Sequence, residues 1–384
     1  MPNADHLEIL SRGVAEWNVW RAAHPEVVPD LTTANLEGAD LPAVNFEGTD
    51  LSGAILANAN LREARMNGAK AIRTEISGTD LVGLRAWNAD FSRSDFGGSL
   101  LTGAILTESR IANANLSGAE LNAAELSFTN LSESRLRATD FSEACLHYTD
   151  LRRSELTNAV LRATQLVGTQ VAGADFTRAR LGWTLLADVD LADARGLREV
   201  VHLGPSTIGI DTLLKSRGII PEEFLRGAGV PEIAREALLS KARDATNFAS
   251  PSCFISGELA DEAFAARLHE RMAQEAIRSW LVPESVRSSR QLQRVWWGAV
   301  HSADRVLVIL PEHERPGSWG GGDLQHARET EARLDAKILI MLRVSKNPSA
   351  AHGPGSHEAH NFSKWKNPAG FEAAFQALLR ELRR

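Results

Sequence analysis

The stretch LTTANLEGADLPAVNFEGTDL, residues 31–51, decides the fold of the N-terminal half of the chain. A large apolar residue returns at every fifth position, beginning at Leu31, and this frame continues without an insertion as far as Leu191. Only Ala71 and Ala86 place a small side chain at that position. A frame held over so many repeats indicates that one unit of five residues is stacked again and again.

The residues between the large positions follow a second rule. Two residues before each large residue there is usually a small one, such as Ala34 or Ala39, and the residue between the two is often Asn or Asp. A period of five matches neither the 3.6 of a helix nor the 2 of a strand. It fits a chain that turns a corner every five residues. The pattern resembles the pentapeptide-repeat family, which implies a β-solenoid over residues 31–195, a right-handed quadrilateral β-helix.

The front of such a solenoid needs a cover, because an open strand edge pairs with other chains. Apolar residues recur at helical spacing between Leu7 and Trp17. We therefore predict one amphipathic helix over residues 5–22, within a capping segment of residues 1–30.

The rear of the solenoid is expected where the five-residue frame stops, at Gly196. Residues 196–249 are predicted to form a connector of short helices that covers this end. Ser206 is expected to cap the first helix, and Pro221 and Pro231 stand where the next two would begin. The amino-acid sequence of this segment is similar to that of the connector in bacterial proteins that join pentapeptide repeats to a further domain.

Residues 250–384 alternate between short apolar runs and segments with helical spacing. Strands buried on both faces and separated by helices indicate a parallel sheet in an α/β domain. The predicted strands are 253–256, 277–282, 305–310 and 337–344, and the predicted helices are 260–276, 292–302, 323–334 and 371–382.

Several motifs of this domain resemble the Toll/interleukin-1 receptor (TIR) family. The resemblance implies a flavodoxin-like α/β fold and self-association of the TIR domains, through a loop that follows Glu284. The matching residues are Phe254-Ile255-Ser256, Asp261, Trp280, Pro283-Glu284, residues 304–310, Ser318-Trp319 and Phe362-Ser363-Lys364-Trp365.

The resemblance also implies a site for NAD as a substrate, with no cofactor. Many TIR domains cleave NAD between nicotinamide and ribose, with a Glu four residues beyond a Trp that stacks on the nicotinamide. This chain has the Trp, at Trp319, and carries Asp323 in place of the Glu. Asp323 is thus the candidate catalytic residue. Trp319, Ser256, Trp280 and Glu284 are the candidate NAD-binding residues.

A second interpretation is a TIR fold that does not cleave NAD. Asp323 is one methylene shorter than Glu, and residues 320–322 are all glycine, which loosens the start of the helix that should hold the carboxylate. Gly257 and Ser288-Ser289 also depart from the family pattern. The alternative is a TIR domain that only assembles with other proteins, with the repeat rod as a rigid platform that receives a protein partner.

Composition and the placement of charged residues argue against several other classes of protein. The chain holds 42 Lys and Arg against 49 Asp and Glu, a net charge of −7, which argues against binding nucleic acid through a broad basic face. Charges of both signs along the repeats argue against a mimic of DNA. The apolar runs are too short for a membrane helix. Two distant cysteines and the polar N-terminus suggest a cytoplasmic protein. His352, His357 and His360 are read as a solvated loop and no metal site is expected.

Overall fold

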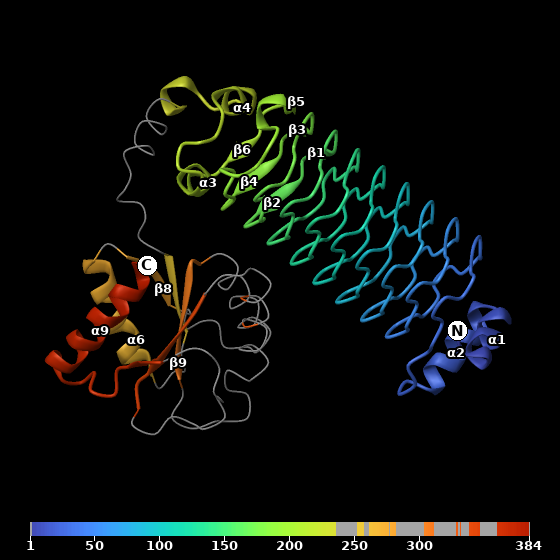
Figure 1. Ribbon diagram of the computed structural model, residues 1–384, viewed down its shortest axis with the longest axis horizontal. Coiled ribbons are helices and arrows are strands. Elements are labelled where there is room, and N and C mark those ends of the chain that lie inside the picture. The colour runs from blue at the N-terminus through green and yellow to red at the C-terminus, as the bar shows by residue number, and fades with distance from the viewer. Residues whose placement is uncertain are drawn as a thin grey trace. The chain divides into compact units, whose positions relative to one another are not determined.

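The computed structural model divides the chain into two compact units, residues 1–245 and residues 246–384 (Figure 1). The residues that it describes are 2–235, 252–256, 261–275, 277–281, 303–310, 328, 331, 338–345 and 359–383.

The first unit is a solenoid in which each side of a coil pairs in parallel with the same side of the next coil (Figure 1). Asp30 pairs with Asp50 and Asn35 with Ile55, so that one coil takes 20 residues, or four pentads. The predicted β-solenoid is confirmed, while its right-handed quadrilateral winding stays a prediction.

Longer strands form near the rear of the solenoid, where two sheets have the orders β1-β3-β5 and β2-β4-β6. Their bounds are β1 Val160–Arg162, β2 Gln165–Val167, β3 Arg180–Gly182, β4 Leu185–Ala187, β5 Val201–His202 and β6 Thr207–Ile208.

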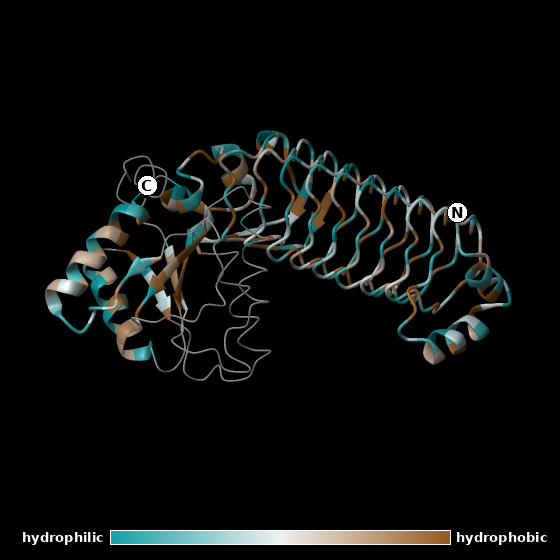
Figure 2. Ribbon diagram, turned by 60° about the horizontal axis from the view of Figure 1, so that its bottom comes forward, coloured by the Kyte–Doolittle hydropathy of each residue, from teal (hydrophilic) through white to brown (hydrophobic). Residues whose placement is uncertain are grey.

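The interior of the solenoid holds the two residue classes that the sequence places there. Large residues such as Leu31 and small ones such as Ala34 are fully buried, and the ribbon alternates between hydrophobic and hydrophilic along each coil (Figure 2). At most of the small positions that carry Ser or Thr, the hydroxyl donates to a carbonyl of the preceding coil. Thr74 Oγ1, for example, donates to the oxygen of Leu51, 23 residues earlier, at 2.9 Å. Buried hydroxyls paired in this way are satisfied, whereas that of Thr49 in the first coil has no partner among the described residues.

The corners of the coil need an unusual backbone. Every fifth residue from Thr33 to Asp188 has a positive φ, whether or not it is glycine. The Asn or Asp before the corner supports the turn, because its side chain accepts the N–H two residues later. Asp50 Oδ1 accepts in this way from the N–H of Ser52 at 3.0 Å.

The front cap consists of two helices, so the predicted single helix over 5–22 is wrong. α1 covers Ala4–Ser11 and α2 covers Val14–Ala23. Between them Gly13 has a φ of 116°, which is outside the helical region. The helical spacing of the apolar residues was correct, but it could not reveal the bend.

Side chains of α2 replace the coil that would precede the first one. Asn18 donates to the oxygen of Ala43 at 3.1 Å and accepts from the N–H of Asn45 at 2.8 Å. Trp17 Nε1 donates to the oxygen of Asn45 at 2.8 Å, and the Trp17 side chain is fully buried. These bonds close part of an edge that would otherwise expose unpaired backbone groups.

The rear of the solenoid lies beyond the predicted end at Gly196. β3 pairs with β5 and β4 with β6, with extra residues between the strands that break the five-residue frame. The predicted N-cap at Ser206 is also wrong, because Thr207 and Ile208 form β6. Two helices complete this end, α3 over Ile210–Lys215 and α4 over Glu222–Gly227. Phe224 of α4 is buried in the core of the solenoid.

The second unit contains a five-stranded parallel sheet of order β11-β10-β9-β7-β8. Counted along the sheet, this is the 2-1-3-4-5 order of flavodoxin-like folds. β11 was not predicted from the sequence. The bounds are β7 Ser252–Ser256, α6 Glu262–Gln274, β8 Arg278–Leu281, β9 Arg305–Leu310, β10 Leu339–Arg343, β11 His360–Asn361 and α9 Pro368–Leu382.

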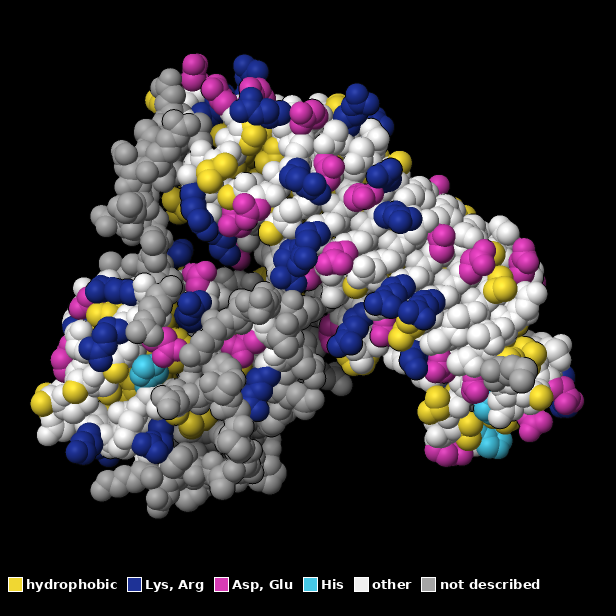
Figure 3. Space-filling model, viewed as in Figure 1, with side chains coloured by type: hydrophobic (Ala, Val, Ile, Leu, Met, Phe, Trp, Pro, Cys, Tyr) yellow, Lys and Arg dark blue, Asp and Glu magenta, His cyan; other side chains and the backbone are white. Residues whose placement is uncertain are grey.

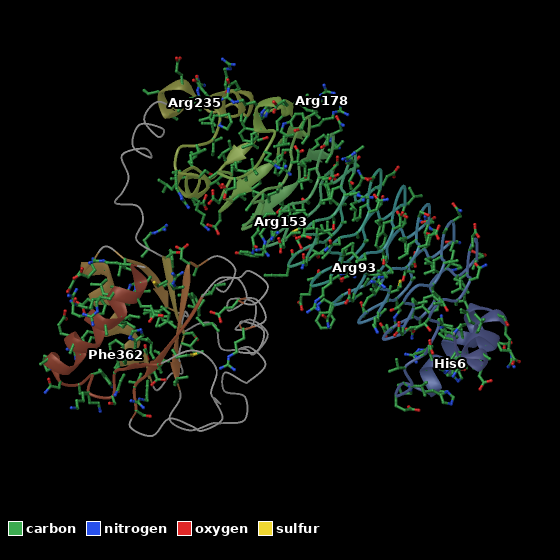
Figure 4. All side chains as sticks on the ribbon, in the orientation of Figure 1. His6, Arg93, Arg153, Arg178, Arg235 and Phe362 are labelled. Carbon is green, nitrogen blue, oxygen red and sulfur yellow. The ribbon has the colours of Figure 1, made fainter. Side chains whose placement is uncertain are left out.

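Helices α6 and α9 pack on the same face of this sheet (Figure 1). Phe362, labelled in Figure 4, is fully buried there with its ring centroid 5.1 Å from that of Phe264. The Arg271 guanidinium lies over the Phe375 ring at 4.6 Å and pairs with Glu372 at 2.9 Å, which joins the two helices. No helix among the described residues has the length and apolar character needed to cross a membrane.

Candidate functional site

The candidate site lies at the carboxyl ends of β7 and β8. β7 has β8 on one side and β9 on the other. The chain thus adds β8 on one side of β7 and then crosses to the other side to add β9, so the direction in which strands are added reverses between β7 and β9. Ligands of open parallel sheets bind outside the strand ends at this kind of switch point. Ser256, the last residue of β7, pairs with Val308 of β9 and is 1% exposed. The structure therefore places this predicted residue at the expected edge.

Trp280 lies on the neighbouring strand and on the same face of the sheet as Ser256. It pairs with Phe254, and residues two apart on a strand point to the same side. The Trp280 side chain is 50% exposed. Its neighbour Ser279 points to the opposite face, where its hydroxyl lies 2.7 Å from Nδ1 of His269 on α6. An exposed indole is thus held beside the switch point.

The other three predicted site residues, Asp323, Trp319 and Glu284, lie outside the described residues. The helix predicted over 292–302 lies outside them as well, and of the helix predicted over 323–334 only residues 328 and 331 are described, both of them helical. The structure brings together two of the five predicted residues, and the roles of all five stay predictions.

Comparison with known families identifies both parts of the chain. A model described as pentapeptide repeats matches in 8 copies between residues 30 and 193, and a model described as a TIR domain matches residues 253–379. The chain is a pentapeptide-repeat protein with a C-terminal TIR domain. A search of curated proteins found no match.

Solved structures similar to this chain are pentapeptide-repeat proteins. HetL from the cyanobacterium Nostoc, a protein involved in heterocyst differentiation regulation, is 26% identical, with 52% of this chain and 97% of HetL covered and a TM-score of 0.27. QnrB1, a plasmid-mediated fluoroquinolone resistance protein, is 21% identical in a trypsin-treated form, with 45% and 84% covered and a TM-score of 0.28. Rfr23 from the cyanobacterium Cyanothece is 26% identical, with 33% and 95% covered and a TM-score of 0.16.

Two other ionisable groups of the TIR domain, those of Asp304 and Cys253, have structural roles. The Asp304 carboxylate accepts both the N–H and the hydroxyl of Ser252 at 2.7 Å, which ties the start of β7 to that of β9. Cys253 is buried on the face covered by α6 and α9, and this burial raises the pKa of its thiol to about 12. A thiol with so high a pKa is not a nucleophile at neutral pH.

Glu331 is close to Asp323 in sequence but performs a different task. Its Oε1 accepts the N–H groups of Ile338 and Leu339, both at 2.7 Å. The carboxylate therefore lies at the amino end of β10, whereas the site lies at the carboxyl ends of the strands. Glu331 cannot replace Asp323 in the candidate site.

His360 is not part of a solvated loop, as the sequence had suggested. It belongs to β11, and its Nε2 lies 2.6 Å from Oε2 of Glu381 on α9. His352 and His357 lie outside the described residues. A two-residue strand in a stretch rich in Pro and Gly leaves almost no periodic signal, which explains why β11 was missed.

Proposed function

We propose that this protein is a signalling or defence effector whose TIR domain cleaves NAD at the nicotinamide–ribose bond when TIR domains associate. The observation that carries the proposal is the TIR match over residues 253–379, which includes the positions of Trp319 and Asp323. The repeat rod serves as a rigid scaffold that sets the spacing of the TIR domains or receives the trigger.

The proposed reaction breaks the bond between C1′ of the ribose and the nicotinamide nitrogen. The bonding electron pair stays with the nicotinamide, which leaves as a neutral molecule because it was cationic in NAD. Water then adds to C1′ and releases one proton, giving ADP-ribose. The transition state resembles an oxocarbenium ion, so that a nearby carboxylate stabilises it, as in glycoside hydrolysis.

In this mechanism Asp323 is the carboxylate and Trp319 stacks on the nicotinamide ring. Ser256 and Trp280 support NAD binding at the switch point, and Glu284 contributes from the following loop. The shorter side chain of Asp323 withdraws the carboxylate by the length of one methylene group. A misplacement of about 1 Å can cost ~100-fold in rate. We therefore expect slow turnover unless association of the domains brings the carboxylate closer to the ribose.

The residue at 323 also favours a second candidate function, a TIR domain that assembles without turnover. Asp323 and the three glycines at 320–322 weaken the placement of the carboxylate, whereas self-association does not need it. The rod would then act as a platform for assembly. Acidic and basic side chains both occur on its visible face (Figure 3), which does not favour a mimic of DNA.

The test is NAD turnover by the purified full-length protein at high concentration, with and without a crowding agent that forces association. Asp323→Asn keeps the shape and removes the charge, and Asp323→Glu restores the family's residue. For the enzyme we expect nicotinamide release by the wild type, a loss of about 100-fold or more in Asp323→Asn, and a gain in Asp323→Glu. Equal thermal stability of the three proteins would show that folding is not the cause.

The two functions give different results. If the wild type releases no nicotinamide while Asp323→Glu does, the fold supports catalysis but the natural residue does not, and the assembly function is correct. If neither protein turns over NAD under forced association, the proposed reaction is wrong. Turnover that survives unchanged in Asp323→Asn would show that the assigned carboxylate is wrong.

A further inference from the structure

A groove of about 510 Å³ lies at the front of the solenoid, between the cap and the first coils. This volume falls in the range of small-molecule sites. The cap contributes Arg21, Pro25, Val27 and Val28, and the coils contribute Glu47 and Arg65. Figure 3 shows hydrophobic and charged side chains together at the surface of this end.

Arg21 brings a buried positive charge to the groove. The residue is 8% exposed, and its guanidinium donates to the oxygens of Val27 and Glu47, both at 2.8 Å. Its Nε has no hydrogen-bond partner, and no carboxylate forms an ion pair with it in the part of the chain that the structure describes. Burial lowers the pKa of the Arg21 guanidinium, and the nearby Glu47 offsets this only in part. A buried charge without a counter-ion is costly.

The position of Arg21 follows from the end of the repeat. In later coils the carbonyl at this corner accepts the N–H of the preceding coil, as the oxygen of Asn67 does from Gly48 at 2.9 Å. No coil precedes Glu47, and Arg21 takes that place. Thr49 shows the same effect of the missing coil, because its fully buried hydroxyl has no partner among the described residues, whereas that of Thr74, 25 residues later, donates to the preceding coil. The groove occupies the space of a missing coil.

The other charges of the groove cancel. Arg65 binds the Glu47 carboxylate through two bonds of 3.1 and 2.8 Å, and Asn67 donates to the same carboxylate at 2.9 Å. What remains is the charge of Arg21. Beside it the cap presents aliphatic surface, including Val28, which is 68% exposed. The groove thus combines one unbalanced cation with an apolar wall.

We propose that this groove binds a carboxylate carried on a short branched apolar group. An acylated apolar amino acid and the C-terminal residue of a polypeptide both have this chemistry. The carboxylate lies against the guanidinium of Arg21, where a charge-assisted hydrogen bond is strong, and the apolar group covers Val28 and Pro25. Sequence patterns could not reveal the site, since an arginine near the end of a helix is common.

The test measures binding to the full-length protein by ligand-observed NMR and calorimetry. N-acetyl-leucine is compared with N-acetyl-leucinamide, which has the same shape without the charge. We expect the acid to bind at least about tenfold more tightly than the amide, the effect of a single charge-assisted contact. N-acetyl-alanyl-alanyl-leucine separates the two sources: tighter binding than N-acetyl-leucine indicates a polypeptide end, and equal binding indicates a free acyl amino acid.

A matched pair of variants locates the site without removing Arg21 from the cap. Val28→Asp puts a carboxylate at the wall of the groove and should weaken binding of the acid about tenfold or more. Val19 is 71% exposed on the same cap and does not line the groove, so that Val19→Asp should leave binding unchanged. The proposal is overturned if acid and amide bind equally, if neither binds at tens of millimolar, or if the two variants behave alike.

Discussion

Single residues at the corners of the solenoid hold a backbone conformation that L-amino acids avoid. Glycine fills some of these positions, such as Gly103, but others carry a side chain, such as Ala123. A left-handed residue with a Cβ costs about 1 kcal/mol or more relative to glycine. The stacked coils must supply that energy, so the corners store small amounts of strain that substitutions can release or add.

Gly103 and Ala123 form a matched pair for measuring this strain. They occupy the same corner in adjacent coils, with φ of 66° and 53°, and a Cβ at Gly103 would meet nothing within 4 Å. We expect Ala123→Gly to raise, and Gly103→Ala to lower, the free energy of unfolding of the solenoid by about 1 kcal/mol each. Denaturant unfolding of the full chain followed by circular dichroism measures both. A change of the same sign in the two variants would contradict the strain argument.

The coils of the solenoid could be predicted because each pentad places one large and one small side chain in the interior. The two ends could not be predicted, because their residues do not follow this five-residue pattern. The bend at Gly13 depends on contacts between the cap and the first coil, and apolar spacing alone continues smoothly through it. Likewise the five-residue frame ends at Gly196 because extra residues follow it in the sequence. Val201 and Thr207 nevertheless pair with the preceding coil.

In the TIR domain most of the single strands could be predicted from the sequence, whereas their order in the sheet could not. Buried strands such as β9 were predicted with their correct bounds, because a run of apolar residues is itself the signal. The pairing of β8 beside β7, which brings Trp280 to the face of Ser256, depends on the sheet order, and the sequence suggests this only through the family resemblance. For Asp323 the sequence can name the residue, but the distance to a substrate is not a property of sequence.

Helix α4 packs tightly over a histidine at the rear of the solenoid. The His202 ring meets the Phe224 ring edge-on at 5.2 Å, and a Cβ at Gly227 would collide with it. Neither ring nitrogen finds a hydrogen-bond partner among the residues that the structure describes. Burial lowers the pKa of His202 below its ordinary value of 6.5. The charged groups of the elements around it include Arg198 and Glu223, which pair with each other at 3.1 Å.

This packing predicts that acid loosens the rear cap. The unfolded chain binds a proton at His202 more readily than the folded one, so the contribution of His202 is complete above pH 6.5 and is lost as the pH falls through its lowered pKa. The slope is at most about 1.4 kcal/mol per pH unit. His202→Leu should remove this part of the pH dependence. Thermal unfolding of both proteins between pH 8 and 5 tests it, and parallel curves would show that His202 does not titrate on unfolding.

The described residues form two hydrophobic cores that share no residue. One runs through the solenoid and includes both caps, from Leu10 to Leu225. The other lies between the sheet of the TIR domain and its helices α6 and α9. In a solenoid each coil contacts only its neighbours, so stability is passed along the rod from coil to coil. A core defect should therefore weaken its own unit.

Two core substitutions in the full-length protein test this independence. Leu126 is fully buried in the middle of the solenoid, and Phe375 is fully buried in the TIR domain. We expect calorimetry to record two transitions. Leu126→Ala should lower only the solenoid transition, by about 2–5 kcal/mol, and Phe375→Ala only that of the TIR domain, by about 3–5 kcal/mol, because each leaves a cavity in one core. If both variants lowered a single common transition, the two units would unfold as one, and the rod would contribute to the stability of the TIR domain as well as to its placement.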